Sequence, residues 1–235
     1  MLQSKPKSVA IVAMGSSQRS YVGLATSLGG RHRLVDEVWA INAMGAVIQH
    51  DLLFAMDDCR VQEARAAADP NGNVAGLMTW LKKHPRFITS TVYDDYRGAE
   101  AFPLQAAIDA YGHAYFNSTV AYAFVFAMLQ GFTDISLFGC DFGYADMNKA
   151  ERGRACLEFW VGIACARGIR VQVAADSQLL DTNCPNEIKL YGYDAYDLTL
   201  DQVAGKPAPQ VVAKRREVLP SAEEIERRYA NVGVA

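Results

Sequence analysis

The stretch that decides the fold is Asn117–Tyr144, which reads NSTVAYAFVFAMLQGFTDISLFGCDFGY. Residues 120–129 are all apolar or aromatic, so they predict a helix that is covered on most of its sides. We expect Ser118 or Thr119 to cap the first turn, and Gly131 to end the helix. This part of the chain therefore predicts a helix in the interior of the molecule.

A buried strand and a polar loop follow this helix. Residues 135–138 form a short apolar run of the kind found in buried parallel strands. Gly139, Asp141 and Tyr144 come directly after it. In open α/β sheets, ligands bind outside the carboxyl ends of the strands. We therefore expect a binding site in this loop.

Strands and helices alternate along most of the chain. The predicted strands are 8–14, 37–42, 51–56, 86–91, 135–138 and 169–174. The predicted helices are 19–28, 61–68, 74–83, 104–110, 120–129 and 148–167. This alternation is typical of right-handed βαβ crossovers. The sequence thus predicts an α/β, Rossmann-like fold with a mostly parallel sheet and helices on both faces.

The pattern changes after residue 181. Cys184-Pro185 is followed by a tyrosine-rich stretch over 191–196, a Gly-Lys-Pro-Ala-Pro linker over 205–209 and a charged helix near 221–229. We therefore predict a core domain over residues 1–180 and a C-terminal extension over 181–235. The extension is interpreted as a lid or as the arm of a homo-oligomer.

Composition restricts the class of protein. The net charge of −3 gives no electrostatic reason to expect nucleic acid or an acidic membrane surface as a partner. The apolar runs are too short for a membrane span or a signal sequence. The five cysteines are scattered and form no CxxC motif, which favours reduced thiols in a soluble, cytoplasmic protein.

Polar side chains follow four of the predicted strands. Gly15-Ser16-Ser17 follows the first strand, where backbone N–H groups and a helix N-terminus often hold a phosphate, although a plain turn is equally consistent. Asn42 ends the second strand and Asp57-Asp58 the third. Because the carboxyl ends of parallel strands converge on one edge, these positions and Gly139–Tyr144 predict a shared cleft.

The acidic residues are the candidates for chemistry. Asp57 and Asp58 are candidate ligands of Mg²⁺ on a nucleotide phosphate, with a helix cap as the alternative. Asp141 is a candidate base or substrate acceptor, and Tyr144 a candidate hydroxyl donor to a phosphate. The alternative for these two is a loop cap and a packing tyrosine. Ser177 is a further candidate contact, or part of an ordinary turn.

Other catalytic patterns are missing from the sequence. The four histidines (32, 50, 84 and 113) show no metal-binding spacing, and each is interpreted as a surface or hydrogen-bonded histidine. There is no GxSxG motif, so a hydrolase nucleophile is not indicated.

Four segments together resemble one family. They are 11–17, 39–42, 51–58 and 118–144, the last with the order helix, Gly, strand, Gly-x-Asp-Phe. This resembles the Rossmann-like superfamily of bacterial lipooligosaccharide sialyltransferases, motility-accessory-factor proteins and 6-hydroxymethylpterin diphosphokinases. The resemblance covers about residues 8–180 and includes phage and prophage proteins, so we expect a phage or prophage origin.

The resemblance implies a nucleotide site and a transfer reaction. It implies nucleotide contacts from Gly15, Ser16, Ser17, Asn42, Ser118, Thr119, Gly139 and Asp141, with Tyr144 as a looser match. Asp58, Asn117 and Ser177 are further candidate contacts from their places at the strand ends and the helix start. Glycosyl or diphosphoryl transfer from a nucleotide or nucleotide sugar is expected, with Asp141 and Asp57 as catalytic residues and Mg²⁺ as a candidate cofactor. Replacing Asp141 with Asn is then expected to abolish turnover with the fold intact.

Two differences from the family leave alternatives open. The first loop has Ala13-Met14-Gly15-Ser16 where the family has Gly-Asn-Gly-Pro, and no histidine follows residue 113. One alternative is a phage nucleotide-binding protein without catalysis. The other is a transferase that modifies DNA bases, for which Lys214-Arg215-Arg216 and Arg227-Arg228 are the basic segments.

Overall fold

The computed structural model describes residues 7–183, 191–206 and 209–230. The chain divides into two compact units, Met1–Leu180 and Asp181–Ala235. Cys184-Pro185 and two residues of the linker, 207 and 208, lie outside the described residues.

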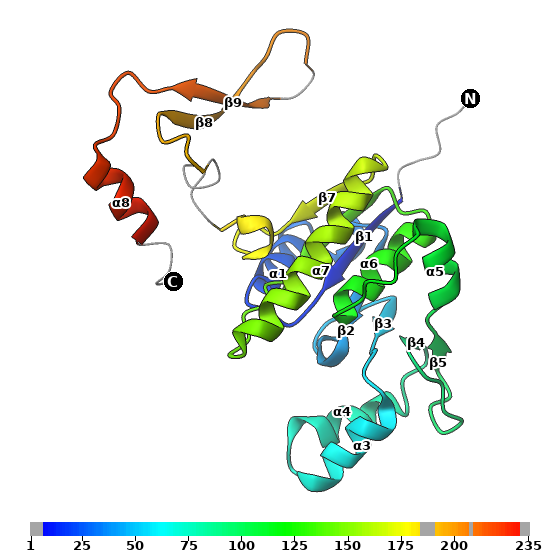
Figure 1. Cartoon of the computed structure of the whole chain (residues 1–235). Coiled ribbons are helices and arrows are strands. Elements are labelled where there is room, and N and C mark those ends of the chain that lie inside the picture. The colour runs from blue at the N-terminus through cyan, green and yellow to red at the C-terminus, as the bar shows by residue number, and fades with distance from the viewer. Residues whose placement is uncertain (1–6, 184–190, 207–208, 231–235) are drawn as a thin grey trace. The chain divides into compact units, whose positions relative to one another are not determined.

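A seven-stranded parallel sheet forms the centre of the first unit (Figure 1). Its strands in spatial order are β5 (Ala99–Ala101), β4 (Phe87–Thr89), β3 (Leu52–Phe54), β2 (Glu37–Ile41), β1 (Ser8–Val12), β6 (Asp134–Phe138) and β7 (Arg170–Val173). Every neighbouring pair is parallel. The α/β, Rossmann-like prediction is confirmed, and the strand order reverses at β1, which pairs with β2 on one side and β6 on the other.

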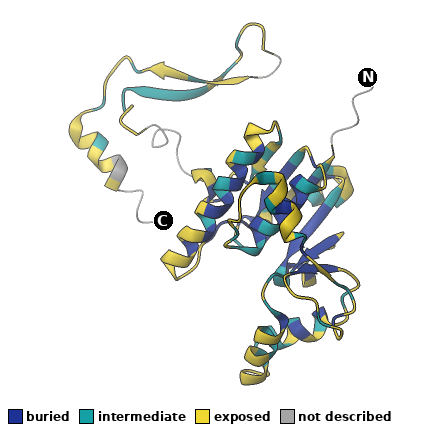
Figure 2. Ribbon diagram, turned by 45° about the vertical axis from the view of Figure 1, so that its right-hand side comes forward, coloured by how far each residue is buried: buried dark blue, intermediate teal, exposed yellow. Residues whose placement is uncertain are grey.

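Helices cover both faces of this sheet. Their bounds are α1 (Gln18–Ser27), α2 (Arg31–Leu34), α3 (Cys59–Ala68), α4 (Asn73–Leu81), α5 (Leu104–Tyr111), α6 (Thr119–Leu129) and α7 (Met147–Ala166), with short 3₁₀ helices η1 (Asn42–Ala46) and η2 (Leu179–Asp181). The pleat of β1 separates two apolar cores, because successive side chains point to opposite faces. Val9 and Ile11 join the core with α6 and α7, whereas Ala10 and Val12 join the core with α1 and α4. Figure 2 shows the strands of the sheet as the most buried part of this unit.

The helix predicted to be buried is α6. Eight of its residues are buried, from Val120 to Met128, and it packs on β1, β2 and β3 between α5 and α7. The Ser118 hydroxyl accepts a hydrogen bond from the Ala121 N–H group and so caps the first turn, as predicted. Gly131 adopts φ 74° after the last turn, a conformation that side-chain-bearing residues avoid.

The sequence did not predict β5 or α2. The segment of β5 reads Ala-Glu-Ala and has no β-branched or aromatic residue, so its strand propensity is low. It is a strand because it pairs with β4 in register, Phe87 beside Ala99. The predicted strand 51–56 is shorter in the structure, where Leu52–Phe54 pairs with β2 and only Leu53 and Phe54 pair with β4 as well.

The second unit contains an antiparallel hairpin and a helix. The strands β8 (Tyr196–Asp201) and β9 (Gln210–Arg215) pair with each other, and α8 (Ala222–Ala230) agrees with the predicted charged helix. The hairpin was not predicted, because the linker between its strands reads as an unstructured connection. Among the described helices of the whole chain, none combines the length and the apolar character that crossing a membrane requires.

Candidate functional site at the carboxyl edge of the sheet

The loops after β1 and β6 meet where the strand order reverses. The Gly15 N–H group donates to the Gly139 carbonyl oxygen at 2.8 Å. Gly139 has φ 66°, and a Cβ atom there would overlap the carbonyl oxygen of Ala13. A Cβ atom at Gly15 would collide with the Asp141 carboxylate. Both glycines are therefore needed for the close approach of the two loops.

The Asp141 carboxylate is buried and fully engaged in this contact. It accepts the Ser17 N–H at 2.7 Å, the Ser17 hydroxyl at 2.5 Å and the Ser16 hydroxyl at 3.3 Å. Ser17 in turn accepts from the Gly139 N–H group at 2.8 Å. The side chain of Asp141 is 4 % exposed and that of Ser17 is fully buried. We call this set, Ser16, Ser17, Gly139 and Asp141, the loop lock.

The loop lock changes the interpretation of the first loop. The Asp141 carboxylate lies at the N-terminus of α1, where a phosphate was expected, and the Gly15 and Ser17 N–H groups already have acceptors within the protein. A bound phosphate there would face this negative charge. The geometry therefore favours a structural role for Asp141 over that of a base.

The N-terminus of α6 offers a different position for an anion. Asn117 is exposed, and its N–H group donates to the Cys156 sulfur at 3.3 Å. The N–H groups of Thr119 and Val120 belong to the first turn, where the helix supplies no acceptor. Because α6 leads into β6, it begins at the edge of the sheet where the parallel strands end.

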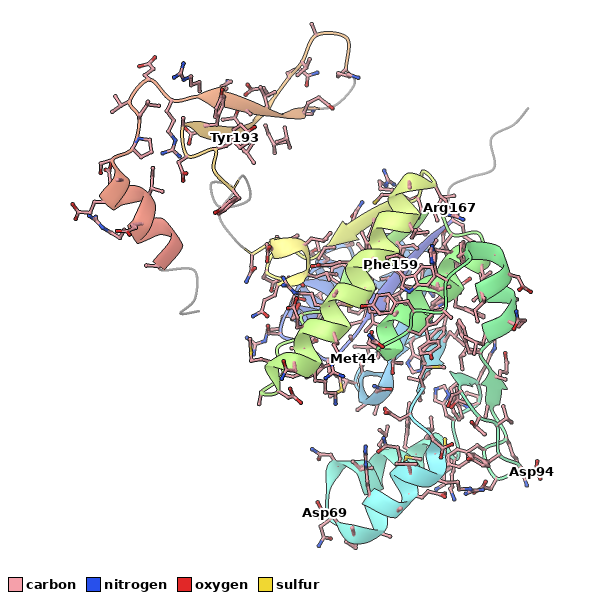
Figure 3. The ribbon with its side chains drawn as sticks, in the orientation of Figure 1. Met44, Asp69, Asp94, Phe159, Arg167 and Tyr193 are labelled. Carbon is pink, nitrogen blue, oxygen red and sulfur yellow. The ribbon has the colours of Figure 1, made fainter. Side chains whose placement is uncertain are left out.

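A mostly apolar hollow of about 200 Å³ opens at the same edge, between the ends of β1, β2 and β3 and the hairpin of α3 and α4. In Figure 3, Met44 marks η1 and Asp69 marks the turn that joins α3 to α4. The hollow is lined by Met14, Asn42, Ala43, Ala55, Asp57, Cys59, Gln62, Asn73, Val74, Leu77, Met78 and Leu81. Its few polar groups are amides and one carboxylate, which suits an aromatic ligand with polar edges.

Asn42 is held in a specific backbone conformation at this hollow. It has φ 51°, in the left-handed region, between β2 and η1. Asparagine tolerates this region better than most residues with a side chain. The turn therefore brings a side-chain amide to the wall of the hollow without a glycine.

Asp57 and Tyr144 lie in the loops that follow β3 and β6. Asp57 is exposed and makes no hydrogen bond or ion pair with the part of the chain that the structure describes. The pKa of Tyr144 is raised, chiefly by burial and further by Cys140 and by the charge of Asp57. A tyrosine with a raised pKa keeps its proton and can donate a hydrogen bond to an anion.

Asp58 caps α3. It accepts the Arg60 N–H at 2.9 Å, the Val61 N–H at 3.2 Å and the Tyr93 hydroxyl at 2.8 Å. The hydrogen bond from Tyr93, followed by that from Val61, lowers the pKa of Asp58. Both carboxylate oxygens are thus in use, which agrees with the helix-cap alternative.

The residues around Asp57 do not fit a tightly held metal ion. Within residues 7–183, 191–206 and 209–230, no three side chains of His, Cys, Asp or Glu converge. Hard cations such as Mg²⁺ prefer several oxygen ligands, and here only the Asp57 carboxylate is uncommitted. The function proposed below therefore uses no metal.

Ser177 lies in the turn after β7. It is buried, its N–H group donates to the Ala174 carbonyl oxygen, and its hydroxyl accepts from the Leu179 N–H group at 3.2 Å. This geometry agrees with the alternative of an ordinary turn.

Sequence reasoning missed one wall of the hollow. Met14, Gln62 and Asn73 line it, but the candidates were confined to other residues at the strand ends and at the helix start over 117–119. Asn73 follows a Pro-Asn-Gly turn, which indicated the start of α4 and not the position of that helix over the sheet. No local signal predicts that two helices cover the ends of β1 to β3.

Three basic residues of the second unit are paired with acidic ones. Lys214 pairs with Asp201, Arg216 with Asp197 and Arg227 with Glu223. These pairs neutralise three of the basic side chains on which a DNA-binding interpretation depended. The structure therefore gives that alternative no additional support.

No family model matches the chain, and no curated protein matches it significantly. The sialyltransferase CstII from Campylobacter jejuni, in complex with the substrate analogue CMP-3FNeuAc, has 14% sequence identity and a TM-score of 0.44, and the match covers 96% of this chain and 99% of that chain. The sialyltransferase CST-II with a trisaccharide acceptor and CMP has 14% identity and a TM-score of 0.43, with 96% and 100% covered. These are enzymes of the kind named by the sequence resemblance. At such low values of identity and TM-score, the likeness carries no argument about function.

Proposed function

We propose that the carboxyl edge of the sheet binds a nucleotide or nucleotide sugar, and that the protein transfers a glycosyl group from it. The observation that supports this most is the hollow between the ends of β1, β2 and β3. It lies beside the point where the strand order reverses, which is where ligands bind in open α/β sheets.

The proposal places the base of the nucleotide in the hollow. Met14, Val74 and Leu77 supply apolar contacts to its faces. The amides of Asn42 and Asn73 can donate to and accept from its polar edge, since an amide carries both kinds of group. This combination of apolar walls and few polar groups is typical of small-molecule sites.

The phosphate is placed at the N-terminus of α6. The N–H groups of Thr119 and Val120 and the positive end of the helix dipole favour an anion there. The Tyr144 hydroxyl is the proposed additional donor. We prefer this position to the first loop, where a phosphate was expected from the sequence, because the Asp141 carboxylate already interacts with the start of α1 there.

The proposed reaction needs one uncommitted base. The acceptor hydroxyl attacks the anomeric carbon, the bond from that carbon to the phosphate oxygen breaks, and Asp57 takes the hydroxyl proton. The nucleotide leaves as its phosphate, whose charge the α6 N-terminus and Tyr144 stabilise. Diphosphoryl transfer is less well supported, because it depended on a metal held by Asp57 and Asp58 together.

The test is a thermal-shift and calorimetric screen of CMP, CDP, UDP, GDP and ATP, with and without Mg²⁺. A nucleotide that binds only the folded state raises the melting temperature by mass action. We expect a response without Mg²⁺, and about tenfold weaker binding in Asn42→Gly, since Gly keeps the positive φ while the amide is lost. Asn71→Gly is the matched control, because exposed Asn71 does not line the hollow.

The outcomes separate the alternatives. Binding without transfer of any sugar to sugar acceptors would favour the non-catalytic nucleotide-binding protein. The absence of binding by every nucleotide of the panel would contradict the proposal.

A further inference from the structure

Two histidines on different segments form a direct contact outside the candidate site. The Nε2 atoms of His50 and His84 are 2.9 Å apart. The ring planes differ by 11° and the ring centroids are 5.2 Å apart, which is the N–N distance plus the two ring radii. The rings are therefore coplanar and head to head, with one N–H···N hydrogen bond between them.

The partners of the other ring nitrogens fix the number of protons on this pair. His50 Nδ1 lies 3.0 Å from the Ile48 carbonyl oxygen, so it must carry a proton and donate it. His84 Nδ1 accepts the Arg86 N–H group at 3.3 Å, so it carries none. One proton is shared between the two Nε2 atoms, so the pair holds two protons and is neutral.

A third proton has no acceptor in this geometry. A third proton between the Nε2 atoms would bring two N–H groups face to face. A third proton on His84 Nδ1 would face the Arg86 N–H group. A metal ion does not fit between the rings either. Two Zn–N bonds of about 2.0–2.1 Å in line need about 4 Å, more than the 2.9 Å between the Nε2 atoms.

No uncommitted acidic group on the adjoining segments would balance the positive charge that a third proton brings. Burial lowers the pKa of His84, and the neighbouring His50 lowers it further. The charged side chains on adjoining segments have other partners: Asp51 pairs with Arg31, Arg86 with Glu100, and Lys82 with Glu63 and Asp95, while Lys83 is exposed. Protonation of the pair would therefore leave an uncompensated positive charge.

The pair is in contact with two elements that line the hollow. Trp80, in α4, packs on His84 with ring centroids 4.8 Å apart. A Cβ atom at Gly45, in η1, would lie 2.8 Å from the Trp80 ring and 3.3 Å from the His50 ring. The element η1 begins at Asn42, and α4 carries Asn73, Val74, Leu77 and Met78, all on the wall of the hollow.

We propose that His50 and His84 form a proton-sensitive clamp that holds η1 and α4 in place and loosens both when the pair takes up a third proton. The consequence is a hollow that keeps its shape near neutral pH and loses it in mild acid. The effect on nucleotide binding rests on the function proposed above, but the protonation of the clamp does not.

The first experiment is an NMR titration of the ¹⁵N-labelled protein, with the ring nitrogens of its four histidines observed. Near neutral pH we expect the Nδ1–H tautomer for His50 and the Nε2–H tautomer for His84. His84 should stay neutral below the ordinary histidine value of about 6.5. Other tautomers, or titration of His84 at or above that value, would overturn the proposal.

The second experiment measures hydrogen exchange at about pH 7.5 and about pH 5.5, corrected for intrinsic rates. We expect protection in η1 and α4 to fall about tenfold in acid, while α7 keeps its protection. His84→Gln should abolish this pH dependence, and His113→Gln, which changes an exposed histidine, should retain it.

The remaining results are also decisive. Unchanged protection of η1 and α4 in acid would refute the clamp, even where the NMR titration agrees. If His84→Gln does not fold, the titration and exchange of the unmodified protein still decide. If no nucleotide binds but both wild-type experiments agree, the proposed function fails and the clamp stands.

Discussion

Replacing Asp141 with Asn tests the loop lock most directly. The change preserves shape and removes the charge from a buried acceptor of three hydrogen bonds. Hydrogen bonds to a charged group contribute about 1.5–3 kcal/mol, and neutral ones about 0.5–1.5 kcal/mol. When the acceptor of the two short hydrogen bonds from Ser17 loses its charge, the free energy of unfolding therefore falls by about 2 kcal/mol.

A second cost arises from the proton of Ser17. The Ser17 hydroxyl already accepts from the Gly139 N–H group, so an amide N–H₂ group facing it leaves the hydroxyl proton without an acceptor. An unsatisfied buried polar group adds about 1–3 kcal/mol. We expect a total loss of about 3 kcal/mol, or about 6–12 °C in Tm. The sequence-based expectation that this variant keeps its fold stays a prediction, to which the structure adds a loss of stability.

The assay is urea unfolding followed by tryptophan fluorescence. The three tryptophans, Trp39, Trp80 and Trp160, all belong to the first unit, so the signal reports its unfolding alone. Asp176→Asn is the matched control, because Asp176 accepts from the Ser20 hydroxyl in an exposed position. It should change the free energy of unfolding by less than about 0.5 kcal/mol. An Asp141→Asn variant as stable as this control would refute the reasoning.

Gly139→Ala should destabilise the protein by more than about 2 kcal/mol, since φ is 66° and a Cβ atom would overlap neighbouring backbone, whereas Gly143→Ala has free space and should be nearly neutral in the same urea assay. The hydrogen bond from Lys82, with others, lowers the pKa of Glu63 to about 2, so its stabilisation is present above about pH 4.5 and is lost as the pH falls toward 2. Acid unfolding should thus be steeper in wild type than in Glu63→Gln, and equal slopes would contradict this. Asp57→Asn should abolish glycosyl transfer while calorimetry shows unchanged nucleotide affinity, and full activity would exclude Asp57 as the base.

The strands of the core could be predicted because each buried strand is a run of apolar residues bounded by glycine or polar residues. The run over 135–138 is an example, and it differs from β6 by one residue. The strand β5 and the hairpin of β8 and β9 could not be predicted, because pairing and not composition makes them strands.

The site could be predicted only to the level of the sheet edge. Asp57 and Asp58 are adjacent and chemically identical, yet one is uncommitted and the other caps a helix and binds Tyr93. The partner of Asp141 lies 124 positions away in Ser17, and His50 meets His84 across 34 positions. Such contacts depend on which strands and helices are neighbours, and single-sequence patterns do not specify this.

The position of β1 in the middle of the sheet has a consequence for the growing chain. β1 is synthesised first, but one of its two neighbours, β6, begins only at Asp134. Until then, the apolar residues 9–12 have an unpaired edge, which is a template for association with other chains. Closing a loop of this length is also slow relative to local contacts. We therefore expect nascent or truncated chains that end before β6 to require chaperones, and expression of the intact core to depend on the speed of this late closure.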